Sequence, residues 1–370
     1  MDIPSDIFSS RGLLPARVLG DAPERAIEGE VRIDINGDSG LLEIETESGA
    51  GSMSLVEPLP GIMISFNDFH MERCVSGFST SAEVLCVDWC EEGRLEQPMA
   101  GGSCAYVAAG DIKVDDRSNH SGEFLLPTGR YRGVTVTYEV ERAQRSILRA
   151  FEGFPVDLRR LRHRYCLDGT PFLLHRCEGA AHIFSELSVT PERIRKSYCQ
   201  IKALELLLLL HMLDPLPANG MAYFPKSQVA RVKQVRDSIA RDLSSTVTVE
   251  EAANLAHMPL TTFKACFKGV YGSSPAAYFR RLKMDLAAQL LRESEMKVAD
   301  IGAAVGYDSP SKFSAAFKSE AVYLHYYEGY PTREIALIVG VSDDAVRQRL
   351  SRARAILRDN LKGDYDDFPA

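Results

Sequence analysis

The sequence has little of what membrane-spanning, secreted or disulfide-stapled proteins need. Its longest apolar run, Leu206–Leu210 extended to Leu213, falls far short of the ~20 residues that cross a bilayer. Its eight cysteines show no paired spacing, which indicates reduced thiols and not a disulfide framework. Met1–Gly20 is interrupted by Asp, Pro and Arg, unlike a signal peptide. We therefore expect a cytoplasmic protein with no membrane partner.

Metal-ligating patterns are also scarce. No His-x-His pair is present, and Cys86 and Cys90 lie four residues apart on an expected strand. That spacing separates the two thiols by about 13 Å at ~3.3 Å per residue, so they cannot share a metal ion. A metalloenzyme on such a sheet would need clustered histidines and carboxylates. We expect no metal, no cofactor and no catalytic residue.

Charge is distributed unevenly along the chain. The net charge is −8, yet residues 229–320 hold 13 Lys and Arg against 10 Asp and Glu. Residues 1–228 carry −10 and residues 321–370 carry −1. The acidity therefore lies in the first half and does not exclude a polyanionic partner for the second. A length of 370 residues predicts two to four domains.

One helical pattern occurs twice within residues 248–318. Each copy has a helix of small apolar residues, a short turn and a second helix with Phe-x-x-x-Phe-Lys, formed by Phe263, Phe267 and Lys268 and then by Phe313, Phe317 and Lys318. The two Phe share one helix face and can anchor the helix while the opposite face stays free. This is the pattern of a helix-turn-helix, whose second helix enters the major groove. The sequence therefore predicts binding to double-stranded DNA.

Residues 228–320 resemble the DNA-binding domain of AraC/XylS-type transcription regulators, in which a long central helix joins two helix-turn-helix units. Besides the Phe motifs, the resemblance is carried by Tyr271-Gly272-x-Ser274-Pro275, the expected central helix Tyr278–Leu291, and Ile301-Gly302-x-x-x-Gly306-Tyr307. It implies base contacts from the second helix of each unit, by Thr261, Lys264, Ala265, Ser311, Lys312, Ser314 and Ala315. It implies phosphate contacts by Lys268, Arg280, Arg281 and Lys318.

The first 150 residues are rich in strand signals. Alternating apolar residues on both sides of the turn 36–40 predict a hairpin over residues 31–46. Further strands are predicted at 61–66, 83–89, 104–108, 111–115 and 133–138, with a turn at Glu92-Gly93, and indicate a small antiparallel barrel or jelly roll. Through Cys90-Glu91-Glu92-Gly93-Arg94 and Ala109-Gly110-Asp111, residues 60–150 are similar to the cupin-type sensor of the same family. That resemblance implies a small-molecule effector, and we predict an apolar-lined pocket for it.

Helices are predicted at residues 155–166 and Pro191–Leu213. The second helix is apolar nearly all round in its C-terminal half, so that half must be buried on several sides. Its leucines fit either the core or a chain–chain interface, and we predict a homodimer interface that contains Leu207 and Leu210. Trp89 is assigned to the core in preference to a ligand platform. Residues 214–220 read as an interdomain linker.

After Phe317-Lys318 the sequence departs from the AraC pattern, because no second Gly-x-Ser-Pro segment follows. From Ala321 it resembles the promoter-reading C-terminal domain of extracytoplasmic-function sigma factors, through residues 323–329, Thr332-x-Glu334-Ile335-Ala336 and residues 341–354. The resemblance implies a third helix-turn-helix, with DNA contacts by Arg347, Gln348, Ser351 and Arg354. The arginine-rich helix is also compatible with a solvated face or with packing on the acidic N-terminal part. Unbroken 3–4 spacing of apolar residues predicts one continuous helix over residues 311–328.

These patterns predict a multidomain α+β protein. We expect a cupin-like β-barrel sensor over residues 1–150, a helical dimerisation segment over 151–213, a linker over 214–227, a tandem helix-turn-helix domain over 228–320 and a third helix-turn-helix over 321–370. The expected function is a sequence-specific, effector-responsive transcription regulator that binds double-stranded DNA as a homodimer and is not an enzyme. Two alternatives stay open: a cupin-type enzyme with DNA-binding appendages, and an adaptor whose sigma-like module contacts RNA polymerase.

Overall fold

A computed structural model describes residues 29–79, 82–99, 102–117, 119–166, 171–188, 190–213, 223–294 and 296–313, and the single residues 316, 332, 344, 347 and 348. The chain divides into two compact units. The first comprises residues 1–229 with the segment Cys266–Gly272, and the second comprises residues 230–265 and 273–370.

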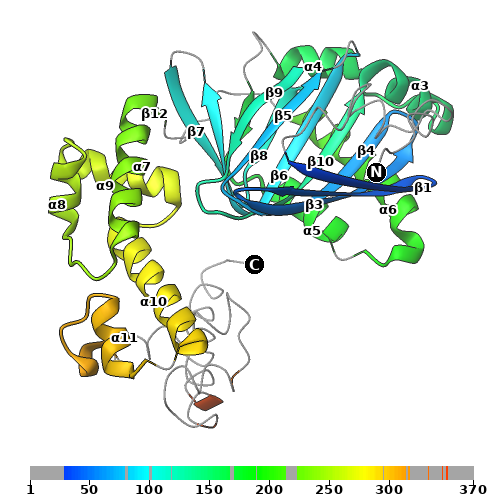
Figure 1. Ribbon diagram of the computed structural model, residues 1–370. Helices are drawn as coiled ribbons and strands as arrows, with labels where there is room; N and C mark the ends of the chain where they lie inside the picture. The colour runs from blue at the N-terminus through cyan, green and yellow to red at the C-terminus, as the bar shows by residue number, and fades with distance from the viewer. Residues whose placement is uncertain are drawn as a thin grey trace, which may run out of the picture. The chain divides into compact units, whose positions relative to one another are not determined.

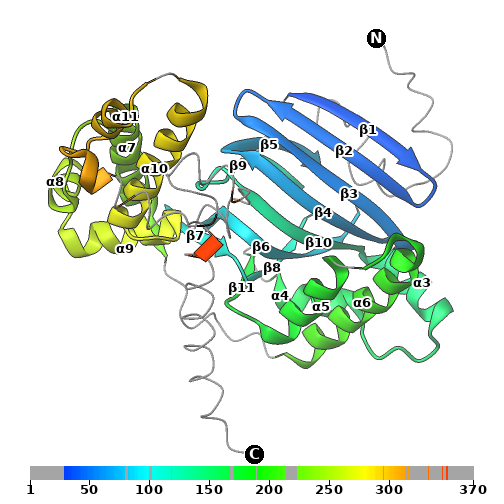
Figure 2. The same ribbon diagram turned by 90° about the horizontal axis from the view of Figure 1, so that it is seen from below.

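The first unit is built on a curled antiparallel sheet (Figures 1 and 2). Its strands are β1 (Glu30–Asn36), β2 (Ser39–Thr46), β3 (Gly49–Leu59), β4 (Ile62–Met71), β5 (Arg73–Ser79), β6 (Val84–Met99), β7 (Ser103–Ala108), β8 (Ile112–Asp116), β9 (Asn119–Leu125), β10 (Tyr131–Glu139), β11 (Phe172–Leu174) and β12 (Phe224–Pro225). The main path runs β1-β2-β3-β4-β10-β6-β7-β12, and β8 and β9 also pair with β6. Among the described strands the path does not return to β1, so the sheet is an open, curled half-barrel and not the closed barrel that the strand pattern predicted.

The predicted hairpin over residues 31–46 is confirmed. Strands β1 and β2 pair in register from Glu30 opposite Glu45 to Asn36 opposite Ser39. Gly37 sits in the turn with φ +61°, a left-handed conformation that glycine adopts without steric cost.

The predicted turn at Glu92-Gly93 is wrong. Strand β6 is 16 residues long and runs without a turn through Glu92 and Gly93. Its pairing with β10 shifts register between Arg132 and Gly133. Gly93 has φ +86°, and a Cβ there would lie 1.9 Å from the carbonyl oxygen of Arg130. Glycine therefore marks an irregularity inside a strand, where the chain passes close to a neighbouring backbone.

Four helices cover one face of this sheet (Figure 2). They are α3 (Val140–Ala150), α4 (Leu158–Tyr165), α5 (Glu178–Ser188) and α6 (Glu192–Met212), of which α4 and α6 fall where helices were predicted. The core between sheet and helices includes Trp89, which is 7% exposed and stacks on Phe184 with ring centroids 5.4 Å apart. The assignment of Trp89 to the core is confirmed.

The prediction that Leu207 and Leu210 form a chain–chain interface is wrong. Both side chains are fully buried in the core of their own chain, together with Leu206. Tyr138 ties α6 to the sheet by donating its hydroxyl to the carbonyl oxygen of Ala203 at 2.7 Å. Helix α6 needed leucines on several sides because it packs on β3 and α5 as well as on the sheet core.

The opposite face of the sheet, which we call the inner face, carries a buried charge cluster. Lys113 places its Nζ 3.1 Å from Asp88 and 3.0 Å from Asp115, and Arg117 pairs with the same two carboxylates. Thr135 donates its hydroxyl to Asp88 at 2.6 Å. Two acids and two bases therefore neutralise one another at a site that is almost closed to solvent.

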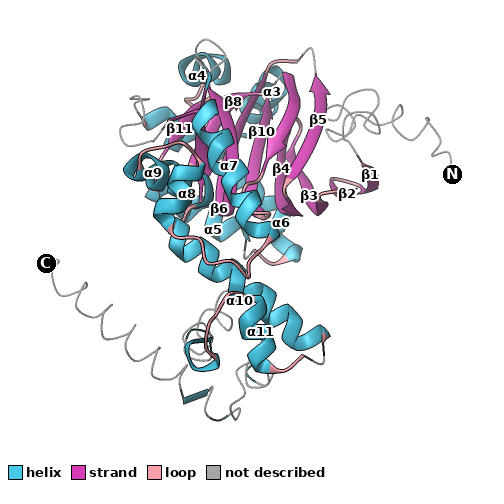
Figure 3. Ribbon diagram, turned by 60° about the vertical axis from the view of Figure 1, so that its left-hand side comes forward, coloured by secondary structure: helices cyan, strands magenta, loops and turns pink. Residues whose placement is uncertain are grey.

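The later part of the chain is helical in the residues that the structure describes (Figure 3). Its helices are α7 (Lys226–Arg241), α8 (Val249–Leu255), α9 (Leu260–Tyr271), α10 (Pro275–Glu293) and α11 (Val298–Ala304). Helix α10 contains the predicted central helix and begins earlier, at Pro275, with Ser274 as its N-cap. The predicted linker at residues 214–220 and nearly all of the predicted continuous helix over residues 311–328 lie outside the described residues.

Candidate DNA-binding surface

The predicted first helix-turn-helix corresponds to helices α8 and α9. Helix α8 begins with a capping box: the Thr248 side chain accepts a hydrogen bond from the Glu251 backbone N–H, and the Glu251 carboxylate accepts one from Thr248 N–H at 2.8 Å. The turn that follows contains His257 at φ +50°, a conformation that non-glycine residues seldom adopt. The start of α8 is therefore fixed by residues next to it in sequence, and the backbone conformation of His257 sets the direction of the turn toward α9.

Helix α9 has one buried face and one exposed face. Phe263 and Phe267 are both fully buried, as the Phe-x-x-x-Phe pattern predicts. The four residues singled out as DNA contacts all lie on the exposed face, at positions 261, 264, 265 and 268. Thr261 and Ala265 lie four residues apart, as do Lys264 and Lys268, so the four residues form one stripe along the helix. Two of the four are lysines, so the stripe is basic.

The predicted second helix-turn-helix is described as far as Phe313, near the start of its predicted second helix. Helix α11 buries Ile301 and Gly302, and Gly302 lies so close to the Phe313 ring that a Cβ there would be 3.2 Å from it. Residues 310–313 are helical, with Phe313 buried and Ser311 and Lys312 exposed. The proposed contacts Ser314, Ala315 and Lys318 lie outside the described residues.

Helix α10 carries the two arginines that were predicted to contact phosphates. Arg280 and Arg281 are both exposed, and Arg281 also forms an i,i+4 ion pair with Asp285 at 3.8 Å.

In the sigma-like segment, Arg347 and Gln348 are exposed, whereas Ser351 and Arg354 lie outside the described residues. The structure thus places every described candidate on the surface and leaves its contact with DNA a prediction.

Lys283 is a supporting residue that the sequence patterns did not single out. Its Nζ donates to the carbonyl oxygen of Ser245 at 3.3 Å, and burial lowers its pKa. The nearby Gly306 has φ +75°, and a Cβ there would lie 2.7 Å from the carbonyl oxygen of Ser244. The turn of the second helix-turn-helix therefore packs against Ser244 and Ser245, which precede α8. In the sequence, only the Gly306-Tyr307 motif indicated that this turn is special.

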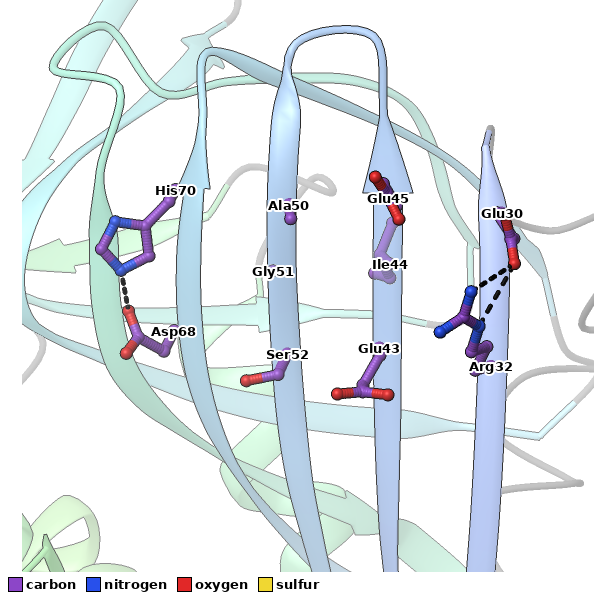
Figure 4. A pocket seen from close by; sticks show the side chains of 10 residues that line it. All are labelled: Glu30, Arg32, Glu43, Ile44, Glu45, Ala50, Gly51, Ser52, Asp68 and His70. Carbon is purple, nitrogen blue, oxygen red and sulfur yellow. Dashed lines mark hydrogen bonds and ion pairs between the residues drawn. The ribbon is translucent and has the colours of Figure 1, made fainter. Parts of the chain in front are cut away.

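The sheet of the first unit has a cleft of about 340 Å³ on strands β1–β4 (Figure 4). Most of its lining residues are charged or polar, with Glu43 and Glu45 on β2, an Arg32–Glu30 ion pair on β1 and a His70–Asp68 contact of 3.1 Å on β4. So many charged side chains do not match the apolar-lined effector pocket that the sequence predicts, and that pocket stays a prediction.

The described part of the chain contains neither a metal-ligating cluster nor a helix that could span a membrane. No group of three or more His, Cys, Asp and Glu side chains there could hold a metal ion. Among the helices that the structure describes, none is both long and apolar enough to cross a bilayer.

Two protein-family models match the C-terminal half of the chain. A helix-turn-helix domain model matches residues 252–322, and a sigma-70 region 4 model matches residues 318–357. The two models meet where the AraC-type pattern gives way to the sigma-type pattern in the sequence. The resemblances to an AraC-type DNA-binding domain and to the C-terminal domain of sigma factors are confirmed.

Curated proteins match the same parts. The chain is 38% identical over 73 residues to the RCS-specific HTH-type transcriptional activator RclR of Escherichia coli, covering 20% of this chain and 26% of that protein. It is 40% identical over 78 residues to a putative AraC-like transcription regulator of Streptomyces lividans, covering 21% and 26%. It is also 47% identical over 49 residues to the probable RNA polymerase sigma factor RfaY of Xanthomonas campestris, covering 13% and 12%. The matches span about a quarter of the length of the two regulators.

Solved structures overlap at low similarity. The DNA-binding domain of AdpA in complex with a target DNA is 24% identical and covers 27% of this chain and 94% of that chain, with a TM-score of 0.24. Unsaturated fatty acid-bound ToxT of Vibrio cholerae is 12% identical and covers 73% and 96%, with a TM-score of 0.28.

Proposed function

We propose that this protein, which carries an AraC-type helix-turn-helix domain followed by a sigma-70 region 4 segment, is a sequence-specific DNA-binding transcription regulator. The observation that carries the proposal is the geometry of α9. Two buried phenylalanines fix the helix, and Thr261, Lys264 and Lys268 lie exposed on the other side. A fixed helix with a basic exposed stripe suits insertion into a major groove.

The two recognition helices can be tested by removing one lysine from each. After a preferred site has been selected from genomic DNA fragments, Lys264→Ala with Lys312→Ala should weaken specific binding, because each lost base contact costs about 1–3 kcal/mol. Lys226→Ala with Arg241→Ala removes the same charge from α7 and serves as the matched control. An unchanged affinity and footprint in the Lys264/Lys312 variant would refute the assignment of these helices.

The sigma-like segment favours a second activity, either promoter reading or contact with RNA polymerase. Its Arg347 and Gln348 are exposed, as a contacting helix requires. Footprints of the full chain and of a chain ending after Lys318 would separate the two roles. An upstream extension of the footprint that is lost on truncation supports DNA reading by this segment. An unchanged footprint combined with loss of polymerase binding supports the adaptor role.

We further propose that the first unit senses a small effector and that the chain forms a homodimer through α6. The buried leucines leave a different apolar stripe exposed on this helix, formed by Ile194, Ile201, Leu208 and Met212 at 47%, 59%, 39% and 77% exposure. Spacings of seven, seven and four residues keep the stripe on one face, as a helix–helix seam requires. We expect no enzymatic activity, because the family models that match the chain are those of DNA-binding transcription proteins.

The dimer proposal predicts that Ile201→Glu with Leu208→Glu converts a dimer into a folded monomer in light scattering at micromolar concentration. Leu207→Glu is the contrasting variant, because it should unfold the sheet–helix core and not merely separate two chains. A wild-type monomer at that concentration would refute the seam.

A further inference from the structure

A second cleft in the first unit lies between the end of the β1–β2 hairpin and the first turns of α6. Its volume is about 430 Å³. Asp34 and Asp38 line it from the hairpin, and Arg195 and Lys196 line it from the helix. Leu55 and Val56 of β3 provide a buried apolar surface between the two walls. The cleft therefore has two charged walls and an aliphatic floor.

Lys196 and Asp38 neutralise each other across the cleft, whereas Arg195 on the helix and Asp34 on the hairpin are unpaired among the described residues. Lys196 forms an ion pair with Asp38. Arg195 lies over the Phe66 ring, 5.9 Å from its centroid, and its Nε is buried without a hydrogen-bond partner. Within the described part of the chain, the side chains of Arg195 and Asp34 form no ion pair or hydrogen bond with each other or with any other residue. A positive and a negative group thus line one cleft without neutralising each other.

The chemistry of these two groups restricts what the cleft can bind. A guanidinium held against an aromatic ring presents its planar N–H groups in a fixed orientation, which suits a carboxylate. Asp34 suits an ammonium group. Glu192 also lines the cleft, so its carboxylates outnumber its cations and a simple anion would meet net repulsion. A ligand that carries both charges and is neutral overall avoids this penalty.

We propose that this cleft binds a small aliphatic α-amino acid, with its carboxylate on Arg195, its ammonium group on Asp34 and its side chain over Leu55 and Val56. The ligand would connect the hairpin to α6 beside Ile194, the first residue of the exposed stripe. This site does not depend on the DNA-binding proposal, because its chemistry involves only residues of the first unit.

Calorimetric titration of the full chain with L-leucine tests the site. Two matched half-ligands separate the two contacts: 4-methylpentanoate lacks the ammonium group, and 3-methylbutylamine lacks the carboxylate. Leucine should bind at least about tenfold more tightly than either half-ligand, since each lost contact is a hydrogen bond between charged groups. Arg195→Gln and Asp34→Asn should each weaken leucine binding by a similar factor.

Arg193→Gln and Glu43→Gln are the matched controls, because both residues are charged, are not buried and lie outside the cleft. They should bind leucine as the wild type does. Asp34 lies on an exposed hairpin, so Asp34→Asn remains informative even if Arg195→Gln disturbs folding. The proposal is overturned if leucine gives no binding heat at millimolar concentration. It is also overturned if 4-methylpentanoate binds as tightly as leucine, or if Asp34→Asn leaves the affinity unchanged.

Discussion

Replacing Asp88 by Asn would leave the buried charge cluster of the inner face with one positive charge too many. Lys113 is 1% exposed and contacts both Asp88 and Asp115, and Arg117 contacts the same two acids. After the substitution, Asp115 alone would face two buried cations. Asn keeps the shape of the side chain and can still accept the hydrogen bond from Thr135, so the change isolates the loss of charge.

The expected cost follows from the burial of the cluster. Removing one partner of a buried ion pair destabilises a protein by about 3–5 kcal/mol. Because Asp115 still pairs with both cations, we expect the lower end, about 3 kcal/mol. Burial alone would raise the pKa of Asp88, but Arg117, Lys113 and Thr135 outweigh burial and hold it well below the usual value. The contribution is therefore fully present above about pH 4 and is lost as the pH falls below that value.

Trp89 provides the assay. It is the only tryptophan of the chain, is buried in the sheet–helix core and follows Asp88 directly, so its fluorescence reports unfolding of the first unit. Urea titration should give a free energy of unfolding about 3 kcal/mol lower for Asp88→Asn than for wild type, with less further loss below pH 4. Glu45→Gln, at an exposed position of β2, is the control and should change little. Adding Lys113→Met to Asp88→Asn should recover part of the loss. A loss below about 1 kcal/mol for Asp88→Asn would refute the charge-balance argument.

Three further changes test single backbone and capping features. Gly93→Ala should lower the free energy of unfolding by about 1–3 kcal/mol or more, because a Cβ would strike the Arg130 carbonyl, whereas Gly102→Ala, with open space around it, should cost less. Equal costs at the two glycines in urea titrations would contradict this. Thr248→Ala should cost about 1 kcal/mol by removing the cap of α8, measured by far-ultraviolet circular dichroism during thermal unfolding, and Thr248→Ser should not. Gly306→Ala should loosen the second helix-turn-helix and weaken DNA binding, while the urea unfolding transition followed by Trp89 fluorescence stays unchanged. An unchanged DNA affinity together with a shifted Trp89 transition would contradict the packing described for that turn.

Local patterns predicted much of the helical part because the residues that fix it are close in sequence. Phe263 and Phe267 are one helical turn apart, so their shared burial follows from periodicity alone. The hairpin over β1 and β2 was equally predictable, since its turn glycine and its alternation lie within 16 residues. Helix α3 was missed because it follows β10 without a break, with Glu139 as its N-cap and no side-chain cap hydrogen bond.

Features that depend on distant contacts were not predictable. Nothing local to Gly93 distinguishes a turn from a strand irregularity, because the decisive neighbour is Arg130, 37 residues later in the chain. Likewise, an apolar helix such as α6 must be buried, but its sequence does not say whether the covering surface belongs to the same chain. The unpaired charges of Arg195 and Asp34 lie on elements more than 150 residues apart in sequence, so no motif could join them.

The position of β10 between β4 and β6 has a consequence for synthesis of the chain. Strand β10 pairs with β4 from Tyr131 opposite Phe69 and with β6 along its other edge. Until residue 139 has left the ribosome, β4 and β6 each have an edge without its β10 partner. Many residues along these edges are buried in the folded protein. Such edges are templates for pairing with other chains. Nascent chains arrested before β10 should therefore aggregate or recruit chaperones, and chains arrested after it should not, which sedimentation of stalled ribosome complexes can measure.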